Sequence, residues 1–138
     1  TPNRSYPFEK FQAIVNAISS KIQVVQIGNT DSKLLRNVID MRGETSFREA
    51  TGVIGKSKLF ISCEGGLAHA ATATDTKALV IITGYQSQRM VAYPQNINVN
   101  ISNHDVCGLK VECPQCKIDA ENHDVNQIIE ITQKALGL

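Results

Sequence analysis

The spacing of hydrophobic residues changes several times along the chain, and each change marks an expected element. Apolar residues repeat at helical spacing in three segments, which predicts helices at residues 8–18, 46–54 and 125–136. Short apolar or β-branched runs predict strands at residues 22–27, 58–62, 78–82 and 97–101. Small residues over 67–74 predict one further helix. Helices and strands therefore alternate along the chain.

This order of elements predicts the fold class. Pro7 suits the first turn of its helix, and Ser46 with Glu49 has the spacing of a capping box. Strands that alternate with helices imply right-handed crossovers, so we expect an α/β, Rossmann-like domain with a parallel sheet covered on both faces. Its length predicts one domain over residues 1–138. Residues 84–94 are expected to form a flexible loop.

Composition and charge narrow the choice of partners. The chain is 42% hydrophobic and 20% charged with a formal net charge of +1, so it lacks the basic character that nucleic acid would favour. No run approaches the roughly 20 apolar residues of a membrane span, and the first residues lack the apolar core of a signal peptide. A cytosolic domain is expected. The start without Met suggests a piece of a longer protein.

Ligands of open parallel sheets bind outside the carboxyl ends of the strands. Residues 63–69 directly follow the strand expected at residues 58–62, so they are candidates for such a site. Gly65 and Gly66 let a ligand approach the backbone, and the free N–H groups of the following helix turn suit a phosphate. His69, one turn into that helix, could donate to a phosphate oxygen. The alternative is that the glycines only permit a tight turn and that His69 is an ordinary surface or helix-packing residue.

Three segments, in matching order, resemble glycosyltransferase family 9, the lipopolysaccharide heptosyltransferases. Residues 57–71 resemble its donor-site motif, an acid-small-Gly-x-x-His turn between a strand and a small-residue helix. Residues 4–7 followed by Phe11 resemble its basic-x-aromatic-Pro entry, and residues 41–47 its Gly-Lys-Thr-Ser-Leu turn. The resemblance implies the donor-binding, C-terminal half of a GT-B transferase, an architecture with two Rossmann-like domains.

Site residues follow from this resemblance. The residues that would bind the donor diphosphate are Arg4, Glu64, Gly65, Gly66, Leu67 and His69. Those that would bind the nucleoside are Asp31, Met41, Gly43 and Thr45. Arg4 stands where the family usually has a Lys. Asp31 would bind the ribose; the alternative is that Asp31 is a solvated turn residue that caps its own loop. Because Glu64 replaces Asp and Gly65 replaces a hydroxyl residue, ADP-heptose is not assumed as donor.

The implied activity is transfer of a sugar, with heptose as one candidate, to a bacterial cell-envelope glycan or lipopolysaccharide acceptor. No catalytic residue is expected in this chain, because the general base would lie in the missing N-terminal acceptor domain. We expect metal-independent transfer without a cofactor, a cytoplasmic location and at most peripheral contact with the inner membrane. The alternative is a stand-alone, non-catalytic nucleotide-binding module. A dinucleotide oxidoreductase is disfavoured, because no G-x-G-x-x-G follows a strand.

Three of the four cysteines lie within ten residues. Cys107, Cys113 and Cys116 form C-x5-C-x2-C, with Cys63 or His123 as candidates for a fourth ligand of structural zinc or iron. Free thiols or a disulfide formed on handling are the alternatives. A metal is not favoured, since a domain of this length does not need a structural metal to stabilise its fold. His104 and His123 are expected to be exposed loop residues.

Overall fold

The structure, a computed structural model that describes residues 2–138, contains two parallel sheets. The larger sheet has the strand order β3-β4-β5, formed by Phe60–Cys63, Ala78–Ile82 and Ile97–Asn100. The smaller sheet pairs β1 (Val25–Gln26) with β2 (Ile39–Asp40). Each of these pairings is parallel, which confirms the expected α/β fold with parallel strands.

The middle strand of the larger sheet, β4, is buried along its whole length. Because side chains alternate along a strand, Leu79 and Ile81 enter one hydrophobic core cluster while Val80 and Ile82 enter another on the opposite face. A strand buried on both faces needs a continuous apolar run, and Ala78–Ile82 provides one. This double burial explains why the strand could be predicted from sequence.

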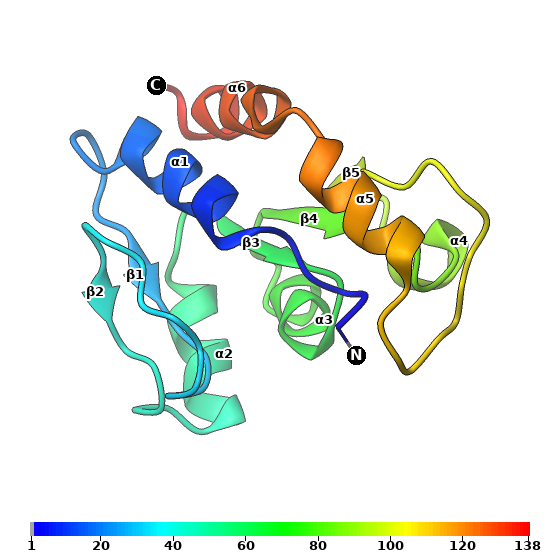
Figure 1. Ribbon diagram of the computed structural model, residues 1–138. Helices are drawn as coiled ribbons and strands as arrows, with labels where there is room; N and C mark the ends of the chain where they lie inside the picture. The colour runs from blue at the N-terminus through cyan, green and yellow to red at the C-terminus, as the bar shows by residue number, and fades with distance from the viewer. Residues whose placement is uncertain (1) are drawn as a thin grey trace.

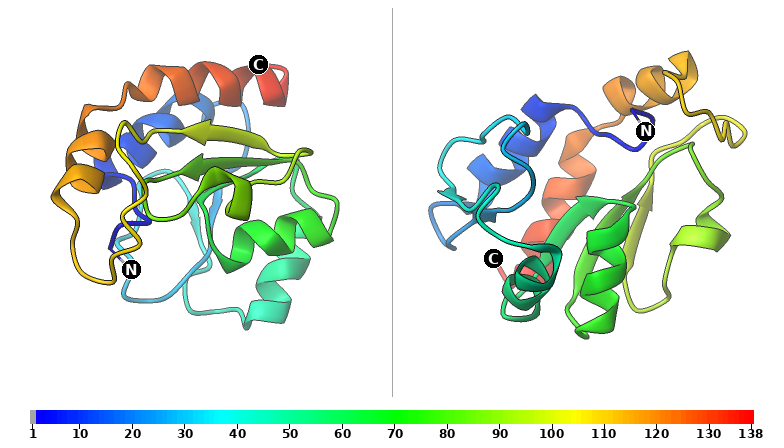
Figure 2. Two further views of the ribbon diagram at one scale, coloured as in Figure 1. Left: turned by 90° about the vertical axis from the view of Figure 1, so that its right-hand side faces the viewer. Right: turned by 90° about the horizontal axis from the view of Figure 1, so that it is seen from below.

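Helices cover both faces of the larger sheet (Figures 1 and 2). On one face, α1 (Phe8–Ile18) and α6 (Val125–Leu136) pack side by side. On the other face, α2 (Phe47–Gly55) packs against α3 (Gly66–Ala73), beside β3. The arrangement leaves the carboxyl ends of the strands open to the loops that follow them, where the expected ligand site lies.

Several elements differ from the sequence-based expectation. The strand expected at residues 22–27 shortens to β1, and it pairs with β2, which lies in a stretch without a clear hydrophobic pattern. The expected loop at 84–94 contains the short helix α4 (Gln88–Val91). The cysteine-containing segment contains α5 (Pro114–Asn122), whose buried residues are Cys116, Asp119 and Ala120. With so few apolar residues on its buried face, α5 has no hydrophobic stripe.

Candidate functional site

The turn between β3 and α3 is supported from inside the protein by Glu64. This side chain is only 5% exposed, and one of its carboxylate oxygens accepts a hydrogen bond of 2.9 Å from the backbone N–H of Thr83. The other oxygen accepts a bond of 2.7 Å from the Thr83 hydroxyl. Through these two bonds Glu64 connects the end of β3 to the end of β4, and it supports the turn from the protein interior.

The two glycines of the turn leave room at its outer side. A Cβ added at Gly65 would meet nothing within 4 Å, and one added at Gly66 would lie 3.6 Å from a ring carbon of Phe47. The first bond of α3 runs from the His69 N–H to the Gly65 carbonyl at 3.2 Å. N–H groups in the first turn of a helix have no partner within that helix, and they attract anions. The turn thus has open space beside backbone N–H groups of the kind that bind anions.

His69 is oriented by a tyrosine that the sequence did not indicate. Its Nδ1 atom lies 2.8 Å from the hydroxyl oxygen of Tyr93, and the two rings meet edge to face at 83°. His69 is exposed, while Tyr93 lies in the segment that was expected to be a flexible loop. Because Tyr93 engages Nδ1, Nε2 is the ring nitrogen that can reach a ligand at the turn.

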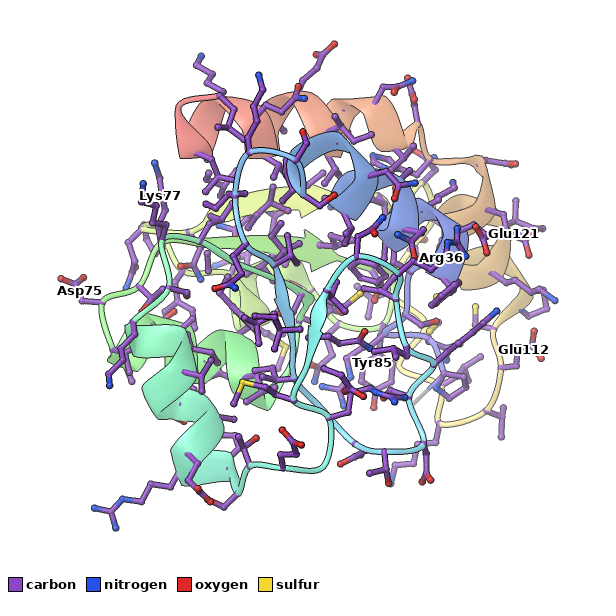
Figure 3. All side chains as sticks on the ribbon, turned by 90° about the vertical axis from the view of Figure 1, so that its left-hand side faces the viewer. Arg36, Asp75, Lys77, Tyr85, Glu112 and Glu121 are labelled. Carbon is purple, nitrogen blue, oxygen red and sulfur yellow. The ribbon has the colours of Figure 1, made fainter. Side chains whose placement is uncertain are left out.

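Arg4 lies over the ring of Tyr85, with 5.0 Å between the guanidinium carbon and the ring centroid. Tyr85 follows β4, and Figure 3 places it away from Lys77 and Asp75, which precede that strand, in the direction of Glu112. The cation–π contact between Arg4 and Tyr85 therefore lies at the carboxyl end of β4. Tyr85 is a second aromatic residue of this region that sequence patterns did not reveal.

The residues expected to bind a nucleoside follow β1 and β2. The N–H of Gly43 donates to the Gly28 carbonyl at 2.6 Å, which joins the loops after the two strands. Gly43 has a φ of 68°, and a Cβ there would overlap the side chain of Thr30, so this close approach requires glycine. Met41 and Thr45 are half-buried beside this junction, and Asp31 is exposed.

Helix α2 connects this nucleoside-side region to the glycine turn. Ser46 caps α2 through the predicted capping box, since its hydroxyl accepts from the Glu49 N–H and the Glu49 carboxylate accepts from the Ser46 N–H. Phe47 is the first residue of α2, and its ring lies beside Gly66, 3.6 Å from where a Cβ on that glycine would be. The N-terminus of α2 therefore lies against the start of α3, as a common binding site requires.

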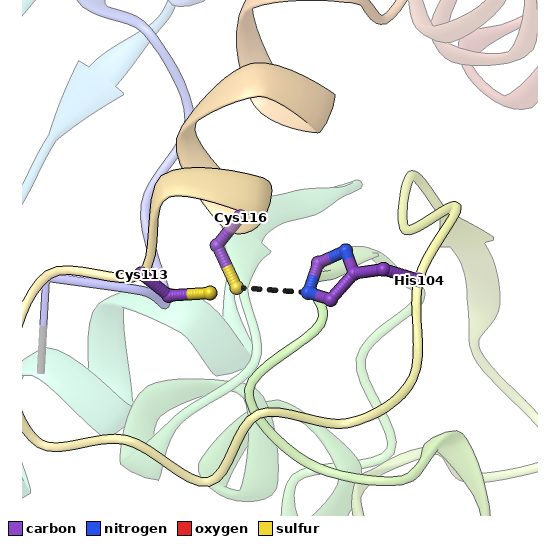
Figure 4. Close-up of side chains that lie close together, drawn as sticks. All are labelled: His104, Cys113 and Cys116. Carbon is purple, nitrogen blue, oxygen red and sulfur yellow. Dashed lines mark hydrogen bonds between the residues drawn. The ribbon is translucent and has the colours of Figure 1, made fainter.

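A second cluster of reactive side chains lies beyond β5. Ligand atoms of His104, Cys113 and Cys116 all lie within 4.8 Å of one another, and Figure 4 shows these side chains pointing toward a shared space. The Cys116 sulfur is 3.4 Å from Nε2 of His104 and 3.6 Å from the Cys107 sulfur. A disulfide requires about 2.05 Å between sulfurs, so these cysteines are free thiols. His104, Cys113 and Cys116 thus form a group of one nitrogen and two sulfur donors, and the Cys107 sulfur lies beside that of Cys116.

The histidine of this cluster is His104, so the expectation that it is an exposed loop residue was wrong. Its Nδ1 lies 2.5 Å from a carboxylate oxygen of Asp119, and the two side chains are only 15% and 9% exposed. The same oxygen of Asp119 also accepts a bond of 2.8 Å from the Asn103 N–H. The acid lies fifteen residues further along the chain, on α5, where no sequence motif connects it to His104.

The two candidates named for a fourth ligand have other contacts. Nδ1 of His123 lies 2.9 Å from the Tyr6 hydroxyl, and its Nε2 lies 2.6 Å from the side-chain oxygen of Gln127. Cys63 packs against the hydrophobic core cluster that contains Leu79 and Ile81. The fold thus places Cys107 beside Cys116, and it groups Cys113 and Cys116 with His104 and not with either candidate.

The electrostatic environments of Cys113 and Cys116 differ. A hydrogen bond from the Cys116 backbone N–H, at the start of α5, lowers the pKa of the Cys113 thiol. Burial raises the pKa of Cys116 to about 12. Of these two thiols, Cys113 is therefore the one that loses its proton more readily, whereas Cys116 needs a positive partner to become a thiolate.

The fold and this site together define a parallel α/β domain with a glycine turn at the carboxyl end of its larger sheet, followed by the first turn of a helix. The family model of glycosyltransferase family 9 (heptosyltransferase) matches residues 2–119. The chain therefore belongs to glycosyltransferase family 9. The match covers both the glycine turn and the cysteine cluster.

A solved structure supports the fold. The chain is similar to the iron-containing dodecameric glycosyltransferase TibC of enterotoxigenic E. coli, with a TM-score of 0.63 and 17% sequence identity. The match covers 96% of this chain and 42% of TibC, so the chain spans less than half the length of that protein. No curated protein sequence matches the chain. Within residues 2–138, no helix combines the length and apolar character needed to cross a bilayer.

Proposed function

We propose that this chain is the donor-binding half of a glycosyltransferase that takes its sugar from a nucleoside diphosphate. The observation that carries the proposal is the open turn at Gly65 and Gly66, which leads into the start of α3. Membership of glycosyltransferase family 9 supports it. A diphosphate at this turn would accept hydrogen bonds from the first N–H groups of α3.

Two cationic or polar side chains supplement the backbone in this proposal. Arg4 can bind phosphate oxygens bidentately, and its contact with Tyr85 restricts the orientation of the guanidinium. His69 can donate from Nε2, because its Nδ1 is engaged by Tyr93. When the sugar departs, negative charge accumulates on the nucleoside diphosphate, and these fixed donors stabilise it. Their role is therefore to hold the donor and to favour its leaving group.

The nucleoside would bind between the loops that follow β1 and β2. Asp31 has the length and the acceptor atoms to bind a ribose diol, and it is exposed. The backbone near Gly43, held against Gly28, would contact the edge of the base. Recognition of the base would therefore rest on backbone groups and not on side chains.

The acceptor and the catalytic base belong, in this proposal, to another domain of the full-length protein. Because glycosyltransferase family 9 is a family of heptosyltransferases, a heptose is one candidate sugar, with a cell-envelope glycan or lipopolysaccharide as acceptor. Such an enzyme would work in the bacterial cytoplasm, at most peripherally at the inner membrane. The match to only 42% of TibC is in keeping with a two-domain enzyme. We expect no transferase activity from the isolated chain.

We further propose that the cysteine–histidine cluster holds a structural metal ion. His104, Cys113 and Cys116, whose ligand atoms lie within 4.8 Å of one another, would supply three ligands of a tetrahedral ion with bonds of about 2.0–2.3 Å. The Cys107 sulfur, 3.6 Å from that of Cys116, is the candidate for the fourth ligand. The hydrogen bond from His104 to Asp119 is the outer contact that metal-bound histidines usually make. The description of TibC as iron-containing supports iron, and zinc suits the same donors. The ion would brace the loop between β5 and α5.

The donor assignment is tested by calorimetric titration with ADP, GDP, UDP and the matching nucleosides. We expect one nucleoside diphosphate to bind best, with its nucleoside at least about tenfold weaker, because the phosphate contacts contribute about 1.4 kcal/mol or more. Binding of a nucleoside as tight as that of its diphosphate would contradict a phosphate site at the turn. Failure of all three diphosphates to bind at millimolar concentration would overturn the proposal.

A further inference from the structure

The side chain of Asn3 joins the start of the chain to the cysteine loop, residues 104–113. It is only 3% exposed, and its Nδ2 donates to the carbonyls of Leu109 and Val111 at 2.8 and 2.9 Å. Its Oδ1 accepts a bond of 2.8 Å from the Cys113 N–H. One amide thus satisfies three backbone groups of a loop more than 100 residues away. Arg4, the next residue, is held by this attachment.

The same loop also holds Tyr85. The Cys107 N–H donates to the Gly84 carbonyl at 2.9 Å, and the Gly108 N–H donates to the Tyr85 carbonyl at 3.0 Å. The ring of His104 occupies the space where a Cβ on Gly84 would lie, so only glycine permits this close packing. The backbone on both sides of Tyr85 is therefore fixed against the cysteine loop.

Arg4 and Tyr85, which form the cation–π contact, are thus both anchored to one loop. We propose that Asn3 is a positioning residue of the donor site, which holds Arg4 over Tyr85 by anchoring the N-terminal segment to the cysteine loop. This inference rests on the proposed function, because it assigns Arg4 to the diphosphate. In this proposal, the cysteine loop determines the position of Arg4, the cationic residue of the donor site.

The physical reason is preorganisation. An arginine side chain loses rotamer entropy when it is fixed, and ordering a mobile backbone would add to that cost. Because Asn3 fixes the backbone in the unliganded protein, less order has to be gained when a diphosphate binds. Loss of the Asn3 amide should therefore weaken phosphate binding without removing any group that touches the ligand.

A double-mutant cycle in this chain tests the inference. The probe is whichever of ADP, GDP and UDP binds the unmodified chain best, with its nucleoside as reference. We expect Asn3→Ala to weaken diphosphate binding about fivefold and to leave nucleoside binding unchanged. Because Asn3 acts through Arg4, the double variant Asn3→Ala/Arg4→Ala should bind no more weakly than Arg4→Ala. The matched control is Asn122→Ala, which changes an exposed asparagine of α5.

The outcomes separate this inference from the proposed function. If the unmodified chain binds none of the diphosphates, the proposed function fails. If it binds one and Asn3→Ala binds equally well, only the positioning role is overturned. Additive losses from Asn3→Ala and Arg4→Ala would overturn it as well, because they would show independent action. If Asn3→Ala does not fold, Asn3→Asp takes its place, since it keeps an acceptor for Cys113 and loses both donated bonds.

Discussion

The glycine turn after β3 and the cysteine cluster after β5 are built in opposite ways. At the turn, backbone N–H groups would contact the ligand, and the buried Glu64 supports them from behind. In the cluster, side chains face the shared space, and Asp119 supports His104. The turn consists of consecutive residues, whereas the cluster combines a loop with the first turn of a helix. Sequence patterns can therefore indicate a site of consecutive residues more completely than one assembled from separate segments.

The largest effect is expected at the cluster. We expect the purified chain to contain one zinc or iron ion and Cys116→Ala to contain none. Removal of the ion should lower the free energy of unfolding by about 4 kcal/mol relative to metal supplied at about 1,000 times its dissociation constant. Elemental analysis and denaturant unfolding measure the two quantities.

Cys63→Ala is the matched control, because Cys63 packs in the core away from the cluster and its loss should not change metal content. Full metal content in Cys116→Ala, or equal loss in both variants, would contradict the assignment. If the unmodified chain contains no metal and takes up none, the metal proposal is wrong and the cysteines of the cluster are free thiols.

The next effect tests the support beneath the turn. Glu64→Ala removes the acceptor of both the Thr83 N–H and the Thr83 hydroxyl, which stay buried, so we expect a loss of about 2 kcal/mol in stability. Urea unfolding measures it, with the exposed Glu44→Ala as control. Unchanged stability together with weaker nucleotide binding would show instead that the Glu64 carboxylate faces the ligand.

These two regions also show how far the sequence could predict the structure. The stripe in α1, the apolar run of β4 and the capping box of α2 are local patterns, and the structure confirms them. Helix α5 was missed because its buried face has only a cysteine, an acid and an alanine. Pro114 at its first turn was the one local indication of a helix.

The cluster was only partly predicted for a similar reason. The spacing of Cys107, Cys113 and Cys116 made them candidate ligands, although a metal was not favoured. The contribution of His104 depends on how the loop after β5 folds back onto α5. In the same way, Tyr85 and Tyr93 reach Arg4 and His69 through tertiary contacts. No spacing rule in the sequence encodes such pairs, because they lie far apart in the chain.

On the ligand side of the turn, we expect Arg4→Ala to weaken diphosphate binding about tenfold and nucleoside binding much less, since a charge-assisted contact contributes about 1.4 kcal/mol or more. Calorimetry measures both. Lys77→Ala is the control, because it removes an exposed cation at the opposite end of the strands, visible in Figure 3. Equal losses for diphosphate and nucleoside would contradict contact between Arg4 and phosphate.

The smallest expected effect concerns the orientation of His69. Tyr93→Phe keeps the ring and removes the hydroxyl that bonds Nδ1, so diphosphate binding should weaken about threefold. Tyr85→Phe is the control, because the ring beneath Arg4 remains and binding should not change. A larger loss in the control than in Tyr93→Phe would mean that the Tyr85 hydroxyl, and not the position of His69, matters to the ligand.

The central claim, that the glycine turn binds the diphosphate, is tested most directly by backbone amide shifts. The chain is titrated with ADP, GDP and UDP while the amide signals of Gly65, Gly66 and His69 are followed. We predict that these signals shift in saturable fashion with at least one diphosphate, and that they move less with its nucleoside. Saturable binding that shifts amides elsewhere and leaves these three unchanged would contradict the account.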